Sequence, residues 1–168
     1  MDFRFVPMFT EIYERGRGDT SQFALDFLEL PAPIEKLHEG QLKWLHSFPW
    51  TPERMLASGN RFGKTVSGAV KLLHNSFYQT RLPQYAEITH EYRSCNLSVT
   101  LDMANIGWNW ASSVAINSPL MKKFVVDIKK RDPFPVMVLG APDGTWRSEI
   151  WARSTANKGY YLLGTSFD

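Results

Sequence analysis

The sequence predicts an α/β fold in which a mostly parallel sheet is flanked by helices and extended by one β-hairpin. Three observations lead to this prediction. Apolar residues recur at helical spacing after Gly63. Apolar and polar residues alternate over 95–101, which is typical of a strand. An Asp-Gly pair lies between the apolar runs 134–139 and 146–152, and this pair favours a hairpin turn.

The first part of the chain is predicted to contain two helices and a short strand. Residues 1–33 are interpreted as an N-terminal arm whose one helical stretch covers 21–30. A helix that ends before Pro49 follows, and a short strand is expected over 54–57. The residues that are spaced like one face of that helix are Ile34, Leu37, Gln41, Trp44, Leu45 and Phe48.

The rest of the chain alternates between helices and strands. Residues 80–94 form a polar connection that leads to the strand over 95–101. Residues 104–124 are predicted to be helical in two pieces broken at Pro119, and 127–135 form a basic, proline-containing connection to the hairpin. The helix after Gly63 is predicted from the spacing of Val66, Ala69, Val70, Leu73 and Phe77.

Composition indicates one globular domain. The chain has 168 residues, of which 43% are apolar and 14% aromatic, enough to bury a substantial core. Its 19 basic and 17 acidic residues give a net charge of +2, which neither predicts nor excludes a nucleic-acid partner. A single cysteine, Cys95, excludes an internal disulfide framework and is expected to be a buried strand residue. No apolar run approaches 18 residues and no signal-peptide pattern is present, so we expect an intracellular protein.

A glycine-containing segment between the short strand and the next helix predicts a phosphate-binding loop. It reads Ser58-Gly59-Asn60-Arg61-Phe62-Gly63-Lys64-Thr65, with Ser58 where the usual pattern has its first glycine. In such a loop backbone N–H groups surround a phosphate, a lysine contacts its oxygens and a hydroxyl binds Mg²⁺. Lys64 and Thr65 have these positions, in the first turn of a helix at the C-terminal edge of the sheet. The segment therefore predicts ATP binding; the alternative is an ordinary strand-to-helix turn.

Other residues have two interpretations each. Arg61 either stabilises charge on the γ-phosphate or forms a salt bridge, and Gln41 either reads the adenine edge or lies on a solvated helix face. Trp108 and Trp110 cannot share one face of a helix, so one of them is expected in the core. The basic residues of one region either follow a DNA backbone or form a solvated face. They are Lys122, Lys123, Lys129, Lys130 and Arg131.

Two enzyme classes are excluded. The histidines have no zinc-type pairing with acidic residues, and no Gly-x-Ser-x-Gly nucleophile turn is present. Metalloprotease and serine-hydrolase activities are therefore not expected.

These segments resemble the ATPase domain of bacteriophage large terminase subunits, the motors that package DNA into procapsids. The loop is similar to the family's Gly-Asn-Arg-x-Gly-Lys-Thr variant, and the helix with Gln41 to the segment that supplies an adenine-contacting glutamine. Residues 144–150 and 162–168 resemble the hairpin and the Leu-x-Gly-x-x-Phe/Leu-Asp run that precede an acidic metal-binding strand. The resemblance covers residues 35–168.

The resemblance implies a phosphate-loop NTPase fold and ATPase activity with ATP and Mg²⁺ as cofactors. It implies double-stranded DNA, the portal protein and the small terminase subunit as partners, and a ring homo-oligomer. The expected location is the cytoplasm of an infected bacterial host, at the procapsid portal and without a membrane. Of the implied nucleotide-binding residues, Lys64 and Arg61 are catalytic and Thr65 is the metal ligand. The whole set is Gln41, Ser58, Gly59, Asn60, Arg61, Phe62, Gly63, Lys64 and Thr65.

The sequence departs from this family at its end. In the family the final run continues into a strand ending in Asp-Glu, which holds Mg²⁺ and activates the attacking water, and the sequence stops at Asp168 before it. We therefore expect residues 34–168 to be the N-terminal part of an incomplete ATPase domain that hydrolyses ATP at trace rates at most. Asp102 is the one internal candidate for a metal-holding carboxylate. The alternatives are a helicase or recombination-type ATPase with the same loop, or a nucleotide-binding module without turnover.

Overall fold

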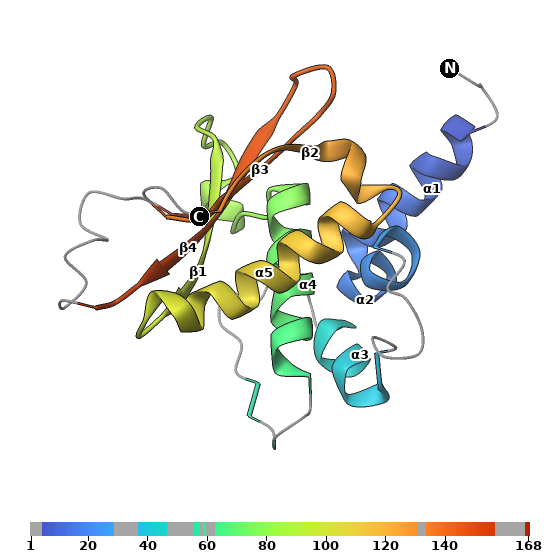
Figure 1. Cartoon of the computed structure of the whole chain (residues 1–168). Helices are drawn as coiled ribbons and strands as arrows, with labels where there is room; N and C mark the ends of the chain where they lie inside the picture. The colour runs from blue at the N-terminus through green and yellow to red at the C-terminus, as the bar shows by residue number, and fades with distance from the viewer. Residues whose placement is uncertain are drawn as a thin grey trace.

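The computed structural model describes residues 5–28, 37–46, 56–57, 59, 63–130, 134–156 and 167–168. In this part of the chain the fold is α/β: a four-stranded sheet in the order β1-β4-β3-β2 packs against helices (Figure 1). The strands are β1 Tyr92–Ser98, β2 Val125–Lys129, β3 Val136–Gly140 and β4 Arg147–Ser154. The helices are α1 Phe5–Gly18, α2 Thr20–Gln22, α3 Glu39–His46, α4 Lys64–Tyr78 and α5 Leu101–Asn117, with a π-helix η1 at Phe23–Phe27 and 3₁₀ turns η2 at Pro83–Tyr85 and η3 at Met121–Phe124.

The sheet is mixed, which corrects the prediction of a mostly parallel sheet. Among the described strands only β1 and β4 pair in parallel, while β3 pairs antiparallel with both β4 and β2. The strand β2 lies where the sequence predicted a connection over 127–135. Asp127 and Lys129 interrupt its apolar residues and so concealed it, and charged side chains of this kind are common on strands at the edge of a sheet.

The hairpin between β3 and β4 is confirmed. Ala141 N donates to Trp146 O at 3.1 Å, and Gly144 N donates to Ala141 O at 2.9 Å. Gly144 has φ +76°, in the left-handed region that favours glycine. The Asp-Gly pair therefore forms the predicted turn.

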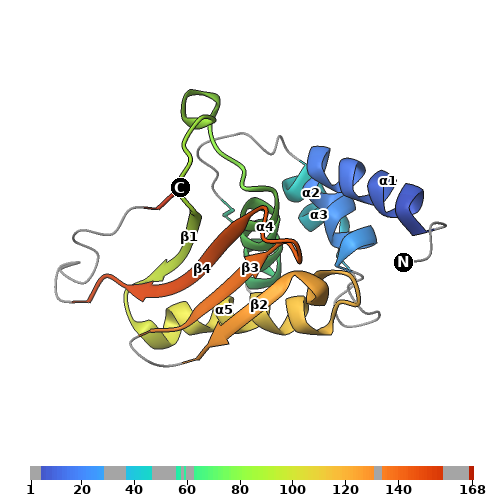
Figure 2. The same ribbon diagram turned by 90° about the horizontal axis from the view of Figure 1, so that it is seen from above.

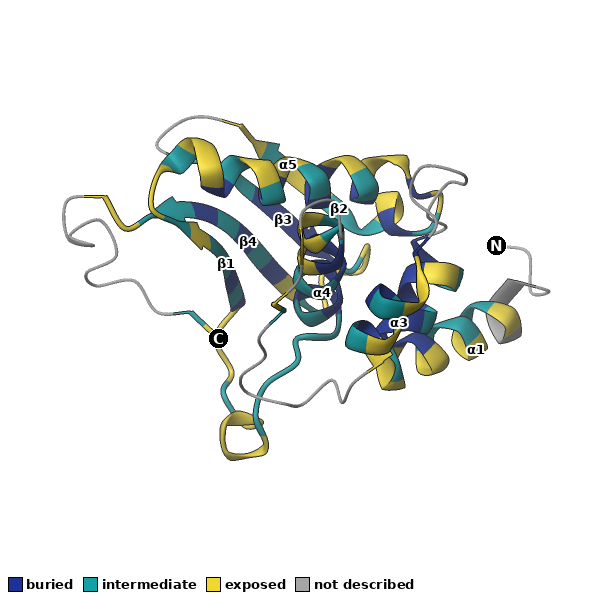
Figure 3. Cartoon of the chain, turned by 90° about the horizontal axis from the view of Figure 1, so that it is seen from below, coloured by how far each residue is buried: buried dark blue, intermediate teal, exposed yellow. Residues whose placement is uncertain are grey.

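Helices α4 and α5 lie side by side and cover one face of the sheet (Figures 1 and 2). Seen from the helix side, buried positions recur along β3, β4 and α4 (Figure 3). Leu73 of α4, Trp108 of α5 and Ile150 of β4 are among the buried core residues, and Trp108 Nε1 donates to Ile150 O at 3.0 Å. Burying side chains of this size supplies about 2 kcal/mol each, so this helix–sheet layer holds α4 in place.

The N-terminal segment is helical over most of its described length, whereas the sequence predicted helix from residue 21 only. The helix α1 contains two glycines near its end, and tertiary packing holds it: the ring of Tyr13 lies 5.8 Å from that of Phe77 in α4. Asp19 begins α2 by accepting a hydrogen bond from Ser21 N at 2.8 Å. Phe23 and Phe27 are fully buried, so this segment contributes to the core.

The strand β1 has the opposite phase from the one its apolar residues suggest. Leu97 is exposed, as is Val99 just after the strand, whereas Ser94 is buried and Cys95 is half-buried. Ser94 Oγ lies 2.6 Å from Ser76 Oγ of α4, so hydrogen bonding satisfies a polar group on the helix-facing side. The prediction of a buried Cys95 is therefore only partly correct, although burial raises the pKa of its thiol to about 11.

Several other helix predictions are confirmed. The two pieces over 104–124 correspond to α5 and η3, separated near Pro119, and Trp108 is the buried member of its pair. The helix before the loop is α3, with Gln41 and Leu45 on its buried side.

Leu56 and Ala57, the described residues of the predicted strand over 54–57, are not in a strand. No described helix has the length and hydropathy needed to cross a membrane.

Candidate functional site

The residues Gly63, Lys64 and Thr65 form the start of α4, as the sequence predicted. Gly63 is the N-terminal cap, with φ +81° and ψ 28°, and Lys64 and Thr65 begin the helix with exposed side chains. The first N–H groups of an α-helix have no intrahelical acceptor, and the helix dipole adds about half a positive charge there. This end of α4 therefore presents backbone donors, an ammonium group and a hydroxyl to the same region. Ser58, Asn60, Arg61 and Phe62 lie outside the described residues.

The Lys64 side chain reaches back to Gly59. Its Nζ donates to the backbone oxygen of Gly59 at 2.8 Å, five residues earlier. This bond joins the first residue of α4 to Gly59 and holds the ammonium group beside the Gly59 carbonyl oxygen.

Gln41 of α3 is buried against the loop and is not on a solvated face. The residue is only 5% exposed. Its Nε2 donates to Gly63 O at 3.2 Å and to Ser67 Oγ at 3.3 Å. Its Oε1 accepts a hydrogen bond from His38 N at 3.0 Å. The interpretation of Gln41 as a solvated side chain is therefore wrong, and its contact with adenine stays a prediction.

Ser67 is a member of this cluster that the sequence analysis missed. It is fully buried in the first turns of α4, and its backbone N–H donates to Gly63 O at 3.0 Å. It could have been recognised from the sequence, because it lies one helical turn after Gly63 and is a serine on a mainly apolar helix face. Its hydroxyl supplies an acceptor to Gln41 where an apolar side chain could not.

A pocket of about 540 Å³ lies beside this cluster, within the size range of small-molecule sites. Lys64 and Thr65 line it from α4, Ser98 from the end of β1 and Met103 from the first turn of α5. The amino end of α4 and the carboxyl end of β1 therefore meet at one edge, the usual place for ligands in α/β sheets. Asp102 lies next to Met103 in the first turn of α5 and is exposed, and its contact with a metal ion stays a prediction.

The basic residues proposed as DNA contacts lie on one short stretch. Lys122 and Lys123 belong to η3, and Lys129 ends β2 with Lys130 after it, all four exposed. Arg131 is outside the described residues. In the parts of the chain that the structure describes, no three histidine, cysteine or carboxylate side chains are grouped as metal ligands.

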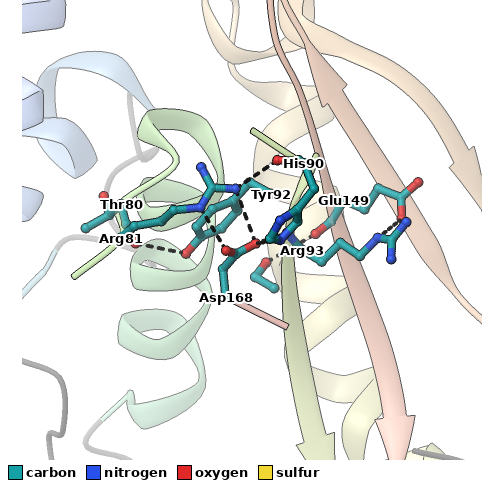
Figure 4. Close-up of polar contacts among 8 residues, drawn as sticks. Thr80, Arg81, His90, Tyr92, Arg93, Glu149 and Asp168 are labelled. Atoms are coloured by element: carbon teal, nitrogen blue, oxygen red, sulfur yellow. Dashed lines mark hydrogen bonds and ion pairs between the residues drawn. The ribbon is translucent and has the colours of Figure 1, made fainter. Parts of the chain in front are cut away.

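A second polar cluster lies at the beginning of β1 (Figure 4). Asp168 N donates to Arg93 O at 2.8 Å, and Arg93 N donates to Asp168 Oδ2 at 2.8 Å. The Asp168 carboxylate also accepts from Arg81 Nε at 2.8 Å, and His90 Nε2 lies 3.5 Å away. Arg81 Nη2 donates to His90 O at 3.0 Å, so the cluster ties the connection after α4 to the strand.

Comparison of the chain with models of protein families, with curated proteins and with solved structures gives no match.

Proposed function

We propose that this protein binds Mg-ATP at the loop that ends in Lys64 and Thr65, and that it is the ATPase core of a viral DNA-packaging motor of the large terminase type. One observation carries the nucleotide site: a Gly-Lys-Thr sequence begins a 15-residue helix, with the glycine at φ +81°. A glycine at positive φ brings the backbone close to a ligand, and the helix N-terminus stabilises an anion.

Each residue has a chemical role in this proposal. The first-turn N–H groups of α4 donate to phosphate oxygens, and Lys64 Nζ exchanges its bond to Gly59 O for one to the β- and γ-phosphates. The Thr65 hydroxyl is a ligand for Mg²⁺, whose charge offsets that of the phosphates. Thr65 suits this role because it is exposed and lines the pocket.

The motor is proposed from the resemblance of the sequence, together with the place of the loop. In the intact motor ATP hydrolysis would drive subunit movement against double-stranded DNA, with the portal protein, the small subunit and further copies of the chain as partners. The exposed lysines of η3 and β2 supply a basic surface for phosphate contacts.

Isothermal titration calorimetry of the chain with Mg-ATP and Mg-ADP tests the nucleotide site. We expect binding by the wild type and a loss of roughly 10- to 100-fold in affinity for Lys64→Ala, because a charge-assisted contact contributes about 1.5–3 kcal/mol. Lys43→Ala removes the same charge from an exposed position of α3 and should bind like the wild type. Equal binding by the wild type and Lys64→Ala, or no binding at millimolar nucleotide, would overturn the proposal.

A further inference from the structure

The geometry points to Gln41 as a positioning residue for the phosphate groups: we propose that it fixes the peptide plane between Gly63 and Lys64, and so acts on any nucleoside triphosphate, whatever its base. This inference rests on the proposed nucleotide site. It differs from the adenine contact predicted from the sequence, in which Gln41 touches the base itself.

The Gln41 amide has one favourable orientation. Nε2 has two hydrogens and two acceptors, Gly63 O and Ser67 Oγ, while Oε1 accepts from His38 N. Turning the amide over would place Oε1 against the Gly63 carbonyl and Nε2 against the His38 N–H, which are repulsive pairs. Because Gln41 and Ser67 are nearly or fully buried, water does not replace these bonds.

The Gly63 carbonyl belongs to the same rigid peptide unit as the Lys64 N–H. A peptide bond is planar and trans, so its C=O and N–H point in opposite directions. Two donors hold the Gly63 oxygen, Gln41 Nε2 at 3.2 Å and Ser67 N at 3.0 Å. With that oxygen held toward α3 and α4, the Lys64 N–H is directed away from them, out of the amino end of α4.

The absence of a side chain at Gly63 leaves room for the Gln41 amide to lie against the backbone there. A Cβ built at Gly63 would collide with Gln41 Nε2, and the residue is already at φ +81°. Gln41 therefore packs directly on the backbone of the loop, in the place that a side chain at residue 63 would take. A bidentate contact with adenine would need Nε2 to leave Gly63 or Ser67, at the cost of a buried hydrogen bond.

The two roles make different predictions for ligands that share phosphates but differ in the base. We expect Gln41→Ala to weaken ATP, CTP and inorganic triphosphate by the same factor, roughly tenfold, the size that follows from one lost hydrogen bond of about 1.4 kcal/mol. If Gln41 instead contacted adenine, Gln41→Ala would weaken the binding of ATP alone and leave the affinities for CTP and triphosphate unchanged. Calorimetric titration of the three ligands with Mg²⁺, at a temperature where every variant is folded by circular dichroism, measures the factors.

Three further variants separate positioning from general destabilisation. Ser67→Ala removes only the hydroxyl that accepts a hydrogen bond from Gln41. It should weaken the binding of all three ligands by a common factor that is smaller than that of Gln41→Ala. Gln41→Glu places a carboxylate against the Gly63 oxygen and should weaken them at least as much as Gln41→Ala. Leu45→Ala, at a fully buried position of the same helix, should lower the melting temperature but leave triphosphate affinity unchanged.

The outcomes decide the inference and the proposed function separately. If Lys64→Ala loses binding while Gln41→Ala and Ser67→Ala bind triphosphate like the wild type, the positioning role is overturned and the nucleotide site stands. A selective loss of ATP in Gln41→Ala also overturns it, in favour of base recognition. If Leu45→Ala weakens triphosphate as much as Gln41→Ala, the effect is general destabilisation and positioning is overturned. If the wild type binds none of the three ligands, the proposed function itself fails.

Discussion

Arg81 and Asp168, which are 87 residues apart in the sequence, form an ion pair: Arg81 Nε lies 2.8 Å from Asp168 Oδ1, with side chains only 9% and 5% exposed. Arg81 also lies over the ring of Tyr92, 5.1 Å from its centroid, and burial raises the pKa of that tyrosine. The pair therefore fastens the connection after α4 to the first residues of β1.

Removing one partner of this pair should be costly. Asp168→Ala leaves the Arg81 guanidinium buried without its carboxylate, and we expect the free energy of unfolding to fall by about 3 kcal/mol. Arg81→Ala should cost a similar amount. Urea unfolding of both variants and of the double variant gives the interaction energy, and the double variant should lose clearly less than the sum. Strict additivity would show that the two side chains contribute independently.

His74 should make the protein less stable in mild acid. It is fully buried, donates from Nε2 to Gly16 O at 3.0 Å, and burial, with the nearby Lys71 charge, lowers its pKa to about 4. The unfolded chain takes up this proton near pH 6.5, so it binds more protons than the native state between pH 6.5 and 4. The contribution of the neutral His74 ring to the free energy of unfolding is therefore fully present above pH 6.5. It is lost as the pH falls toward 4, by about 3 kcal/mol in all.

Urea unfolding at a series of pH values measures this loss. His74→Gln keeps an N–H donor for Gly16 O but does not titrate, so the fall in stability between pH 6.5 and 4 should be smaller than in the wild type. An equal fall in both proteins would assign the acid sensitivity to other groups.

The helices α3, α4 and α5 and the hairpin could be predicted from the sequence because local patterns determine them. The apolar spacing of α4 and the Asp-Gly turn are both features of a few neighbouring residues. The helix α1 and the strand β2 could not, because tertiary contacts decide them: α1 depends on rings packed against α4, and β2 on pairing with β3. In β1 the polar residues face the helices since Ser94 finds a partner in Ser76.

The candidate site was predictable to a similar extent. The place of Lys64 and Thr65 at a helix start follows from Gly-Lys-Thr before a helical pattern. The contact between Gln41 and Gly63 joins residues 22 positions apart, and no local pattern encodes it. The sequence shows that Gln41 has an amide that can donate and accept hydrogen bonds. Which groups this amide contacts depends on how α3 packs against α4.

The glycine at position 63 provides a sharp test of the loop. Gly63→Ala should lower the free energy of unfolding by about 2 kcal/mol, because alanine is strained at φ +81° and its Cβ would displace the Gln41 amide. Gly68→Ala, five residues later in the same helix, is the matched control: a Cβ there meets nothing within 4 Å, so we expect a gain of about 0.5–1 kcal/mol. Thermal unfolding followed by circular dichroism should therefore show melting temperatures that move in opposite directions. If Gly63→Ala were as stable as the wild type, the left-handed conformation and the packing of Gln41 on this residue would not describe the loop in solution.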